Sequence, residues 1–143
     1  MKSPDTIELV HEFDHPRERV FDAWLKAETL SRFMMPAPGV RVTDVRVDAR
    51  EGGEFSLNMV AGQAIIPIRG RYQRIVPHSS LAFTWLSART LETSLVTLKF
   101  DSLGEGRTRL TLGHSGFPDA ESRGDHEGGW GRILKTLAEA LPL

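Results

Sequence analysis

The feature that most constrains the fold is a C-terminal amphipathic segment that follows a long succession of short strands. Its apolar residues recur at steps of three and four, which places them on one face of a helix. They are Trp130, Ile133, Leu134, Leu137, Ala138 and Leu141. Residues 40–116 are predicted to form short strands almost throughout. A sheet built from them has one apolar face, and that face needs another element to cover it. The sequence therefore predicts a twisted, curled sheet packed on one long terminal helix.

The segment before residue 40 predicts one strand and two short helices. Apolar and polar residues alternate over residues 7–14, as they do in a half-buried strand. Pro16 fits the start of a helix over residues 16–26. A second turn or helix follows and ends at Pro36, because proline cannot continue helical hydrogen bonding.

About six further strands, joined by hairpin-length turns, imply an antiparallel sheet. Each strand has one apolar side, so one face of the sheet is covered and the other faces water. The parity of the apolar residues changes between Val42 and Val45, which predicts a bulge or a bend there. Pro67 removes a ladder donor, so we expect an irregularity at that end of its strand.

The start of the terminal helix is less sharply defined. Residues 119–127 are polar, and the helix is expected to begin at Asp119, Ser122 or Asp125. Gly128 and Gly129 are poor helix formers near this start. Their lack of side-chain bulk could leave clearance for a bound molecule.

Composition excludes several classes of function. The chain has 143 residues, which suits one domain with one core. Its net charge of -1 gives no strong field for nucleic acid or an anionic membrane. It has no cysteine, which removes disulfides, thiolate catalysis and cysteine metal sites. No apolar run resembles a signal peptide or a membrane span, so we expect a cytoplasmic protein.

Two histidines, His11 and His114, fall on the apolar side of their strands. One interpretation is that they are polar anchors for a ligand, or acid–base groups. The other is that they are hydrogen-bonded core residues. Ser115 is not paired with His114 for nucleophilic catalysis, because adjacent strand residues point to opposite faces. No metal is expected, since three ligands would have to converge from scattered positions. No cofactor is expected either, because the glycine pairs match neither a dinucleotide nor a phosphate loop.

Several short motifs, taken in order, resemble one protein family. They are Arg19-Val20-Phe21-Asp22-Ala23-Trp24, the Gly52-Gly53 turn, Gly70-Arg71-Tyr72 leading to Leu81-Ala82-Phe83-Thr84-Trp85, Gly106-Arg107-Thr108-Arg109-Leu110-Thr111-Leu112, His114-Ser115-Gly116-Phe117, and Gly129-Trp130 with Leu134 and Leu137. In this order they resemble the activator of heat shock protein 90 ATPase homologue-like family, within the START-like (SRPBCC, birch-pollen-allergen-like) superfamily. The resemblance covers about residues 6–142 and implies a single START-like domain over residues 1–143.

The resemblance implies an α+β helix-grip fold. In that fold a seven-stranded curved antiparallel sheet wraps around a long C-terminal helix, and two short helices follow the first strand. A cavity lies between the sheet and the helix. Two departures bear on function. Members often carry a tryptophan pair where this chain has Phe33-Met34-Met35-Pro36, which would make a cavity mouth more adaptable. The eukaryotic chaperone activators have a further domain that this chain lacks, so a chaperone partner is not expected.

The resemblance also implies the function that we expect, which is binding of a small apolar or aromatic molecule in that cavity. Such a function predicts an enclosed pocket of several hundred Å3 with few charged groups. The expected ligand-binding residues are Phe33, Met34, Phe55, Leu57, Met59, Ile68, Tyr72, Phe83, Trp85, Leu98, Leu112, His114 and Trp130. Tyr72, Trp85 and His114 would supply the orienting polar groups. The sequence leaves open whether the protein forms a homodimer.

Two other functions stay open as alternatives. One is an enzyme related to polyketide cyclases and aromatases, in which His114 or Tyr72 would be the acid–base group. The other is a protein-interaction module related to the chaperone ATPase activators. An enzyme requires an ionisable group with a shifted pKa inside the pocket, whereas an interaction module predicts a filled cavity and an exposed apolar patch.

Overall fold

The computed structural model describes residues 6–141, which form one seven-stranded sheet and three helices. The elements are β1 (Ile7–Phe13), α1 (Arg17–Ala23), α2 (Ala27–Phe33), β2 (Val40–Val47), β3 (Glu54–Ala61), β4 (Ala64–Val76), β5 (Ser80–Thr84), β6 (Leu95–Gly104), β7 (Arg107–Ser115) and α3 (Ala120–Ala140). The strand order is β1-β7-β6-β5-β4-β3-β2, and every neighbouring pair is antiparallel. The predicted helix-grip fold is confirmed.

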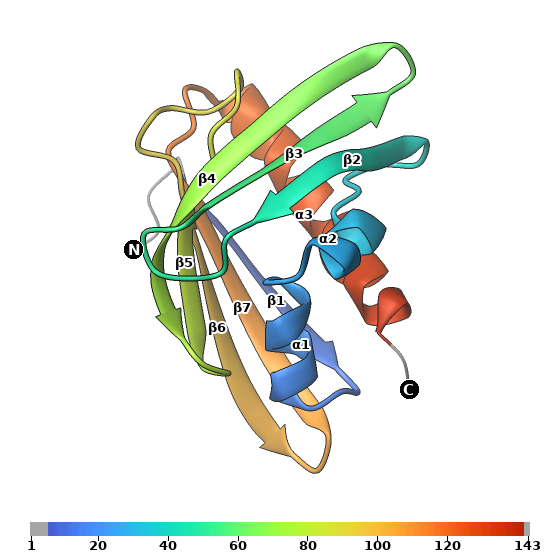
Figure 1. Cartoon of the computed structure of the whole chain (residues 1–143), viewed down its shortest axis with the longest axis vertical. Helices are drawn as coiled ribbons and strands as arrows, with labels where there is room; N and C mark the ends of the chain where they lie inside the picture. The colour runs from blue at the N-terminus through green and yellow to red at the C-terminus, as the bar shows by residue number, and fades with distance from the viewer. Residues whose placement is uncertain (1–5, 142–143) are drawn as a thin grey trace.

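The sheet curls around α3, and α1 and α2 lie on the same concave side (Figure 1). β1 pairs with β7, so the first and last strands of the chain are neighbours. Phe83, Trp85 and Leu110 all face this side and are at most 4% exposed. The apolar faces that alternation predicted for the strands therefore meet the helices, and the core lies between the two layers.

α3 starts at one of the three predicted positions. Asp119 is its N-cap, and the Asp119 carboxylate accepts a hydrogen bond from the Ser122 amide at 2.8 Å. The predicted apolar face is confirmed, because its central residues are buried: Trp130, Ile133, Leu134 and Leu137. Gly128 and Gly129 consequently lie inside the helix rather than at its start.

The two glycines have different surroundings. A Cβ added at Gly128 would meet no atom within 4 Å, whereas one at Gly129 would lie 3.0 Å from the Cβ of Pro36. Gly129 thus lets α3 approach the segment after α2 closely, and Gly128 has no such role.

Alanine substitution should separate the two positions. Gly128→Ala is expected to raise the free energy of unfolding by about 1 kcal/mol, because alanine is the better helix former. Gly129→Ala should raise the free energy of unfolding by less than this, or should lower it, because Pro36 has to move to make room for the added Cβ. Urea unfolding of the two variants measures the difference, and equal stabilisation would contradict the close approach to Pro36.

The predicted bulge in β2 is confirmed. The pairing of β2 with β3 slips between Thr43 and Arg46, and Asp44 between them has a φ of 54°. The extra residue returns the apolar side chains to the core side after the change of parity between Val42 and Val45.

The irregularity predicted at Pro67 is wrong, and the direction of the backbone explains why. β4 stays in register with β3 across Pro67, which lies opposite Asn58. Two residues further on, the Arg69 amide donates to the Leu86 carbonyl at 3.1 Å, on the side of β4 away from β3. Pro67 has the same orientation as Arg69, and β5 is too short to pair with β4 there. The ring therefore displaces no ladder donor.

Candidate functional site

The centre of the domain is packed with aromatic side chains. The ring centroids of Phe55 and Phe83 lie 5.4 Å apart, and those of Trp85 and Trp130 lie 5.0 Å apart. A void of about 10 Å3 remains among them, which is about the volume needed for a single water molecule. Its walls are Trp24, Leu30, Met34, Phe55, Leu57, Tyr72, Phe83 and Trp85. The central part of the space between the sheet and the helices therefore has no room for a ligand.

An open pocket of about 180 Å3 lies beside this core, between α3 and the inner face of β3 and β4. Its apolar walls are Pro36, Met59, Ile66, Ile68, Trp85, Gly129, Trp130 and Ile133. Its polar groups are Ser87, Arg89, Asp125 and His126. The pocket is smaller and more open than the enclosed one predicted from the sequence, because the large rings occupy the centre. It is the candidate site.

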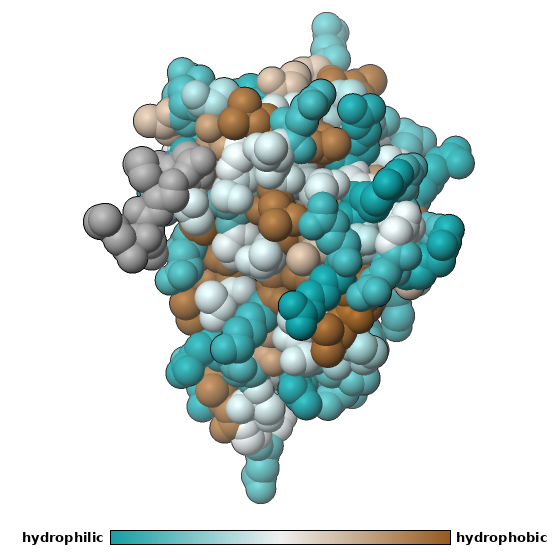
Figure 2. All heavy atoms as spheres, turned by 90° about the vertical axis from the view of Figure 1, so that its left-hand side faces the viewer, coloured by the Kyte–Doolittle hydropathy of each residue, from teal (hydrophilic) through white to brown (hydrophobic). Residues whose placement is uncertain are grey.

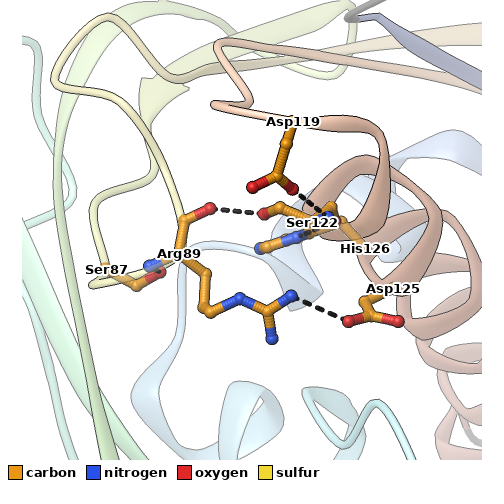
Figure 3. Close-up of polar contacts among 6 residues, drawn as sticks. All are labelled: Ser87, Arg89, Asp119, Ser122, Asp125 and His126. Carbon is orange, nitrogen blue, oxygen red and sulfur yellow. Dashed lines mark hydrogen bonds and ion pairs between the residues drawn. The ribbon is translucent and has the colours of Figure 1, made fainter.

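The segment of residues 86–92, which follows β5, is tied to the first turns of α3 (Figure 3). The Arg89 guanidinium lies 2.8 Å from the Asp125 carboxylate, and the Ser122 hydroxyl donates to the Arg89 carbonyl. The Arg89 amide in turn donates to the Ser87 hydroxyl at 3.1 Å. The side chains of the ion pair are 50% and 60% exposed, so the pair lies at the solvent edge of the pocket and stabilises the fold only slightly.

His114 lies behind the pocket wall in a closed hydrogen-bond chain. The Trp130 indole, which can only donate, gives a hydrogen bond to His114 Nδ1 at 2.9 Å. The neutral ring therefore carries its proton on Nε2, which donates to Ser94 Oγ at 2.7 Å. Burial, together with nearby His126, lowers the pKa of His114 to about 3. His114 is thus neutral at physiological pH, and both of its nitrogens are occupied.

His126 lies one turn before Trp130 on α3 and lines the pocket. Its Nδ1 is 2.7 Å from the Ser122 carbonyl, which can only accept, so Nδ1 carries the proton. Burial lowers the pKa of His126, and Arg89 lowers it further against the opposing effects of the Ser122 carbonyl and Asp125. The neutral form leaves a lone pair on Nε2. Among residues 6–141, Nε2 has no hydrogen-bond partner.

Two buried indole groups also lack partners. Within the described part of the chain, neither Trp24 Nε1 nor Trp85 Nε1 makes a hydrogen bond. A buried donor without a partner costs roughly 1–3 kcal/mol, so such a group calls for an explanation. Trp24 borders only the small central void, whereas Trp85, which is 3% exposed, also lines the pocket.

Tyr72 and His11 are poorly placed for the pocket. Tyr72 packs against Phe55 and Phe83 in the centre, and burial, with nearby Asp48, raises the pKa of its phenol. Its hydroxyl therefore stays protonated at neutral pH. His11 lies on β1 with its ring 4.6 Å from Phe13, and burial lowers its pKa.

The residues proposed from the sequence as ligand-binding fall into three groups. Those at the open pocket are Met59, Ile68, Trp85 and Trp130. Those that border the central void are Met34, Phe55, Leu57, Tyr72 and Phe83. The remainder lie in the core and line neither space: Phe33, Leu98, Leu112 and His114.

Sequence reasoning missed the polar half of the pocket. Ser87 and Arg89 come from a segment without periodicity, so no pattern placed them. Asp125 and His126 lie in the polar lead-in to the helix. One signal was available for His126, because it stands four residues before Trp130 and therefore shares its helix face.

The outer face of the sheet carries a separate groove of about 660 Å3 between β2, β3, β4 and the 86–92 segment. Its lining is mixed in charge, with Arg46 and Arg69 beside Asp44 and Glu92. In the view of Figure 2, apolar side chains form several separate groups among hydrophilic ones. Scattered exposure of this kind is normal for a protein surface.

Two features are absent from residues 6–141. No group of three or more His, Asp or Glu side chains in this range is arranged to hold a metal ion. No helix there is long and apolar enough to cross a membrane.

Comparisons with known proteins agree with this geometry. The family model described as activator of Hsp90 ATPase homolog 1-like protein matches residues 14–142. A crystal structure of a Chromobacterium violaceum protein is 27% identical, with a TM-score of 0.86 over 97% of this chain and 98% of that one. An HSP90 activator from Plasmodium falciparum is also 27% identical, with a TM-score of 0.72 over 91% of each chain. A Nitrosomonas europaea protein, 23% identical, has the same fold with a TM-score of 0.81 over 98% of this chain and 96% of that one. No curated protein sequence matches the chain.

Proposed function

Because this chain belongs to the activator of Hsp90 ATPase homologue 1-like family, and its helix-grip fold carries a pocket beside the C-terminal helix, we propose that it binds a small apolar or aromatic molecule there. The observation that carries the proposal is the pocket between β3, β4 and α3. Most of its walls are apolar, among them the buried ring of Trp85.

The size of the pocket limits the ligand to about one ring. An apolar protein cavity of about 150 Å3 takes up benzene, and this pocket has about 180 Å3. Burial of one ring at about 25 cal/mol per Å2 stabilises the complex by on the order of 4 kcal/mol, which corresponds to a Kd in the millimolar range. A larger ligand has to displace the 86–92 segment or extend into solvent.

The geometry weighs against an acid–base enzyme that uses the residues first considered. His114 has both ring nitrogens in hydrogen bonds within the protein and a pKa lowered to about 3. Tyr72 has a raised pKa and borders only the central void. Neither side chain reaches a substrate in the open pocket, so binding without proton transfer by these groups is the better supported function.

Titration with toluene, followed by 1H–15N NMR, tests the proposal. Saturable shifts are expected at the amides of the pocket residues. Ile66, a wall residue that is 40% exposed, allows a blocking variant: Ile66→Trp should fill the pocket and abolish binding without truncating the core. Trp85→Ala should weaken binding, whereas Arg71→Ala should leave it unchanged, because Arg71 is on the outer face and pairs with Glu54.

Two results would contradict the proposal. One is the absence of saturable shifts at the pocket in the unsubstituted protein. The other is equal binding by the Ile66→Trp variant and the unsubstituted protein, which would place the ligand elsewhere.

A protein-interaction function is the second candidate, favoured by the likeness to the Plasmodium falciparum HSP90 activator and by the outer groove. It predicts that addition of purified Hsp90 shifts amides on the outer faces of β3 and β4 and leaves the pocket amides unchanged. Shifts confined to the pocket, or none at all, would count against it.

A further inference from the structure

The 86–92 segment separates two hollows of the domain. It contributes Ser87 and Arg89 to the pocket beside α3, and all of its residues except Arg89 to the outer groove. We propose that this segment is a lid, held shut by its ties to α3, and that its opening joins the pocket and the groove into one site for an elongated molecule with an apolar body and a polar end. This inference rests on the ligand-binding function proposed above, and it adds the shape and chemical class of the ligand.

A gap in the sheet lies beside the segment. The bridge between Arg69 and Leu86 is the last pairing between β4 and the chain that follows β5. Beyond this bridge, β4 runs on toward its hairpin with β3 on one side and, within residues 6–141, no strand on the other (Figure 1). Ile68, next to the bridge, and Ser87, in the segment, line both the pocket and the groove. The two hollows therefore meet at the free edge of β4, where the 86–92 segment closes the passage.

The segment has firm ends and a loosely held middle. At its base the Trp85 amide donates to the Ser94 carbonyl at 3.2 Å, and both residues are buried. By contrast, none of residues 86–92 is buried, and Leu91 is 44% exposed. A segment without buried side chains lacks the apolar contacts that would fix it to the core. It therefore opens at a lower free energy than the sheet does.

The contacts that hold the segment against α3 and the chain before it are polar. Arg89 makes two of them, through the ion pair with Asp125 at 2.8 Å and through its carbonyl, which accepts from the Ser122 hydroxyl (Figure 3). Another runs from the Leu91 amide to the Gly116 carbonyl at 2.8 Å. Exposed ion pairs and single hydrogen bonds contribute little each. A ligand that gains new contacts in the open state can therefore shift the segment toward that state.

The joined site defines the ligand. Its inner end has apolar walls, including Met59, Trp130 and Ile133, whereas its outer end carries charged and amide groups, including Arg46 and Asn58. A molecule that spans both ends needs an apolar body and a polar end that both donates and accepts hydrogen bonds, such as a hydroxyl. Because this molecule binds the open state alone, its apparent affinity rises with the population of that state.

Two alcohols of different length test the inference by 1H–15N NMR. 1-Butanol is short enough to remain in the pocket and should leave the groove amides of Ser56 and Asn58 unshifted. 1-Octanol reaches past the segment and should shift these two amides as well as those of the pocket. Shifts by 1-octanol that are confined to the pocket would overturn the lid, because the chain would then leave through the open mouth of the pocket.

Two variants weaken different contacts of the segment. Arg89→Gln removes the ion pair with Asp125, and Ser122→Ala removes the hydrogen bond to the Arg89 carbonyl. Each should raise the affinity for 1-octanol relative to 1-butanol by about twofold to fivefold, which is the factor that one such contact contributes to an equilibrium constant. Arg71→Gln is the matched control. It removes a similarly exposed ion pair, with Glu54 at 3.0 Å, that lies outside the segment, and it should leave the ratio unchanged.

Hydrogen exchange of the Leu91 amide reports opening without any ligand. Exchange should be about twofold to fivefold faster in Arg89→Gln and Ser122→Ala than in the unsubstituted protein, because the bond to the Gly116 carbonyl breaks when the segment opens. An unchanged exchange rate and an unchanged ratio of affinities in both variants would contradict the role of these contacts.

The outcomes separate this inference from the proposed function. Binding of toluene and 1-butanol in the pocket, without any shift in the groove on addition of 1-octanol, would overturn the lid and leave the ligand-binding function intact. If no probe binds in the pocket, the proposed function itself fails, and the lid fails with it.

Discussion

Acidification from pH 6.5 to about pH 3 is expected to lower the free energy of unfolding by about 4 kcal/mol through His114 alone. The folded protein keeps this ring neutral, because it is 1% exposed and its Nδ1 already accepts from Trp130. The unfolded chain has no such constraint and takes up a proton below the ordinary histidine pKa of 6.5.

The sign follows from the direction of the shift. Because the pKa of His114 is lower in the folded state, the unfolded state binds more protons throughout this window. Stability is therefore complete above pH 6.5 and falls by up to about 1.4 kcal/mol per pH unit as the solution becomes more acidic. The lowered pKa of His126 acts in the same direction, so the total loss exceeds the share of His114.

His114→Gln provides the matched control. A glutamine amide can accept from the Trp130 indole and donate to Ser94, yet it does not titrate. Urea unfolding at several pH values between 7 and 4 should show a smaller pH dependence in this variant than in the unsubstituted protein. Identical slopes for the two proteins would contradict the assignment of a buried neutral His114.

The fold could be predicted well from the sequence, because burial of one face imposes a period of two on each strand and steps of three and four on the helix. A one-residue error of parity would have turned Phe83 and Trp85 to solvent, so alternation indicated the covered face of the sheet unambiguously. The apolar steps around Trp130 located the helix that covers it. Where local chemistry depended on a neighbouring strand, as at Pro67, the prediction was wrong, because the sequence does not show where β5 ends.

The candidate site was harder to predict than the fold. The inward parity of His114 was visible in the sequence, but its partners Trp130 and Ser94 come from α3 and from the segment before β6, and only the tertiary arrangement joins them. The volume of the pocket depends on how the central rings pack, which side-chain spacing does not determine. Arg89 belongs to a segment with no regular pattern, so nothing indicated that it reaches α3.

Trp130→Ala is expected to have the second large effect, a loss of about 4 kcal/mol in the free energy of unfolding. The side chain is 2% exposed and lies where α3 meets the sheet, against Trp85 on one side and Trp24 on the other, with centroid distances of 5.0 and 6.2 Å. Truncation leaves a cavity, and it also leaves the Nδ1 of a buried His114 without its donor. Urea or thermal unfolding measures the loss.

A pair of phenylalanine variants separates the hydrogen bond from the packing. Trp130→Phe and Trp24→Phe remove the same atoms from two buried tryptophans, but only the Trp130 indole has a partner. Trp24→Phe removes a donor that was already unsatisfied, whereas Trp130→Phe leaves His114 Nδ1 unsatisfied. Trp130→Phe should therefore cost about 1–3 kcal/mol more than Trp24→Phe. Equal losses in the free energy of unfolding would mean that the hydrogen bond from Trp130 to His114 adds nothing to stability.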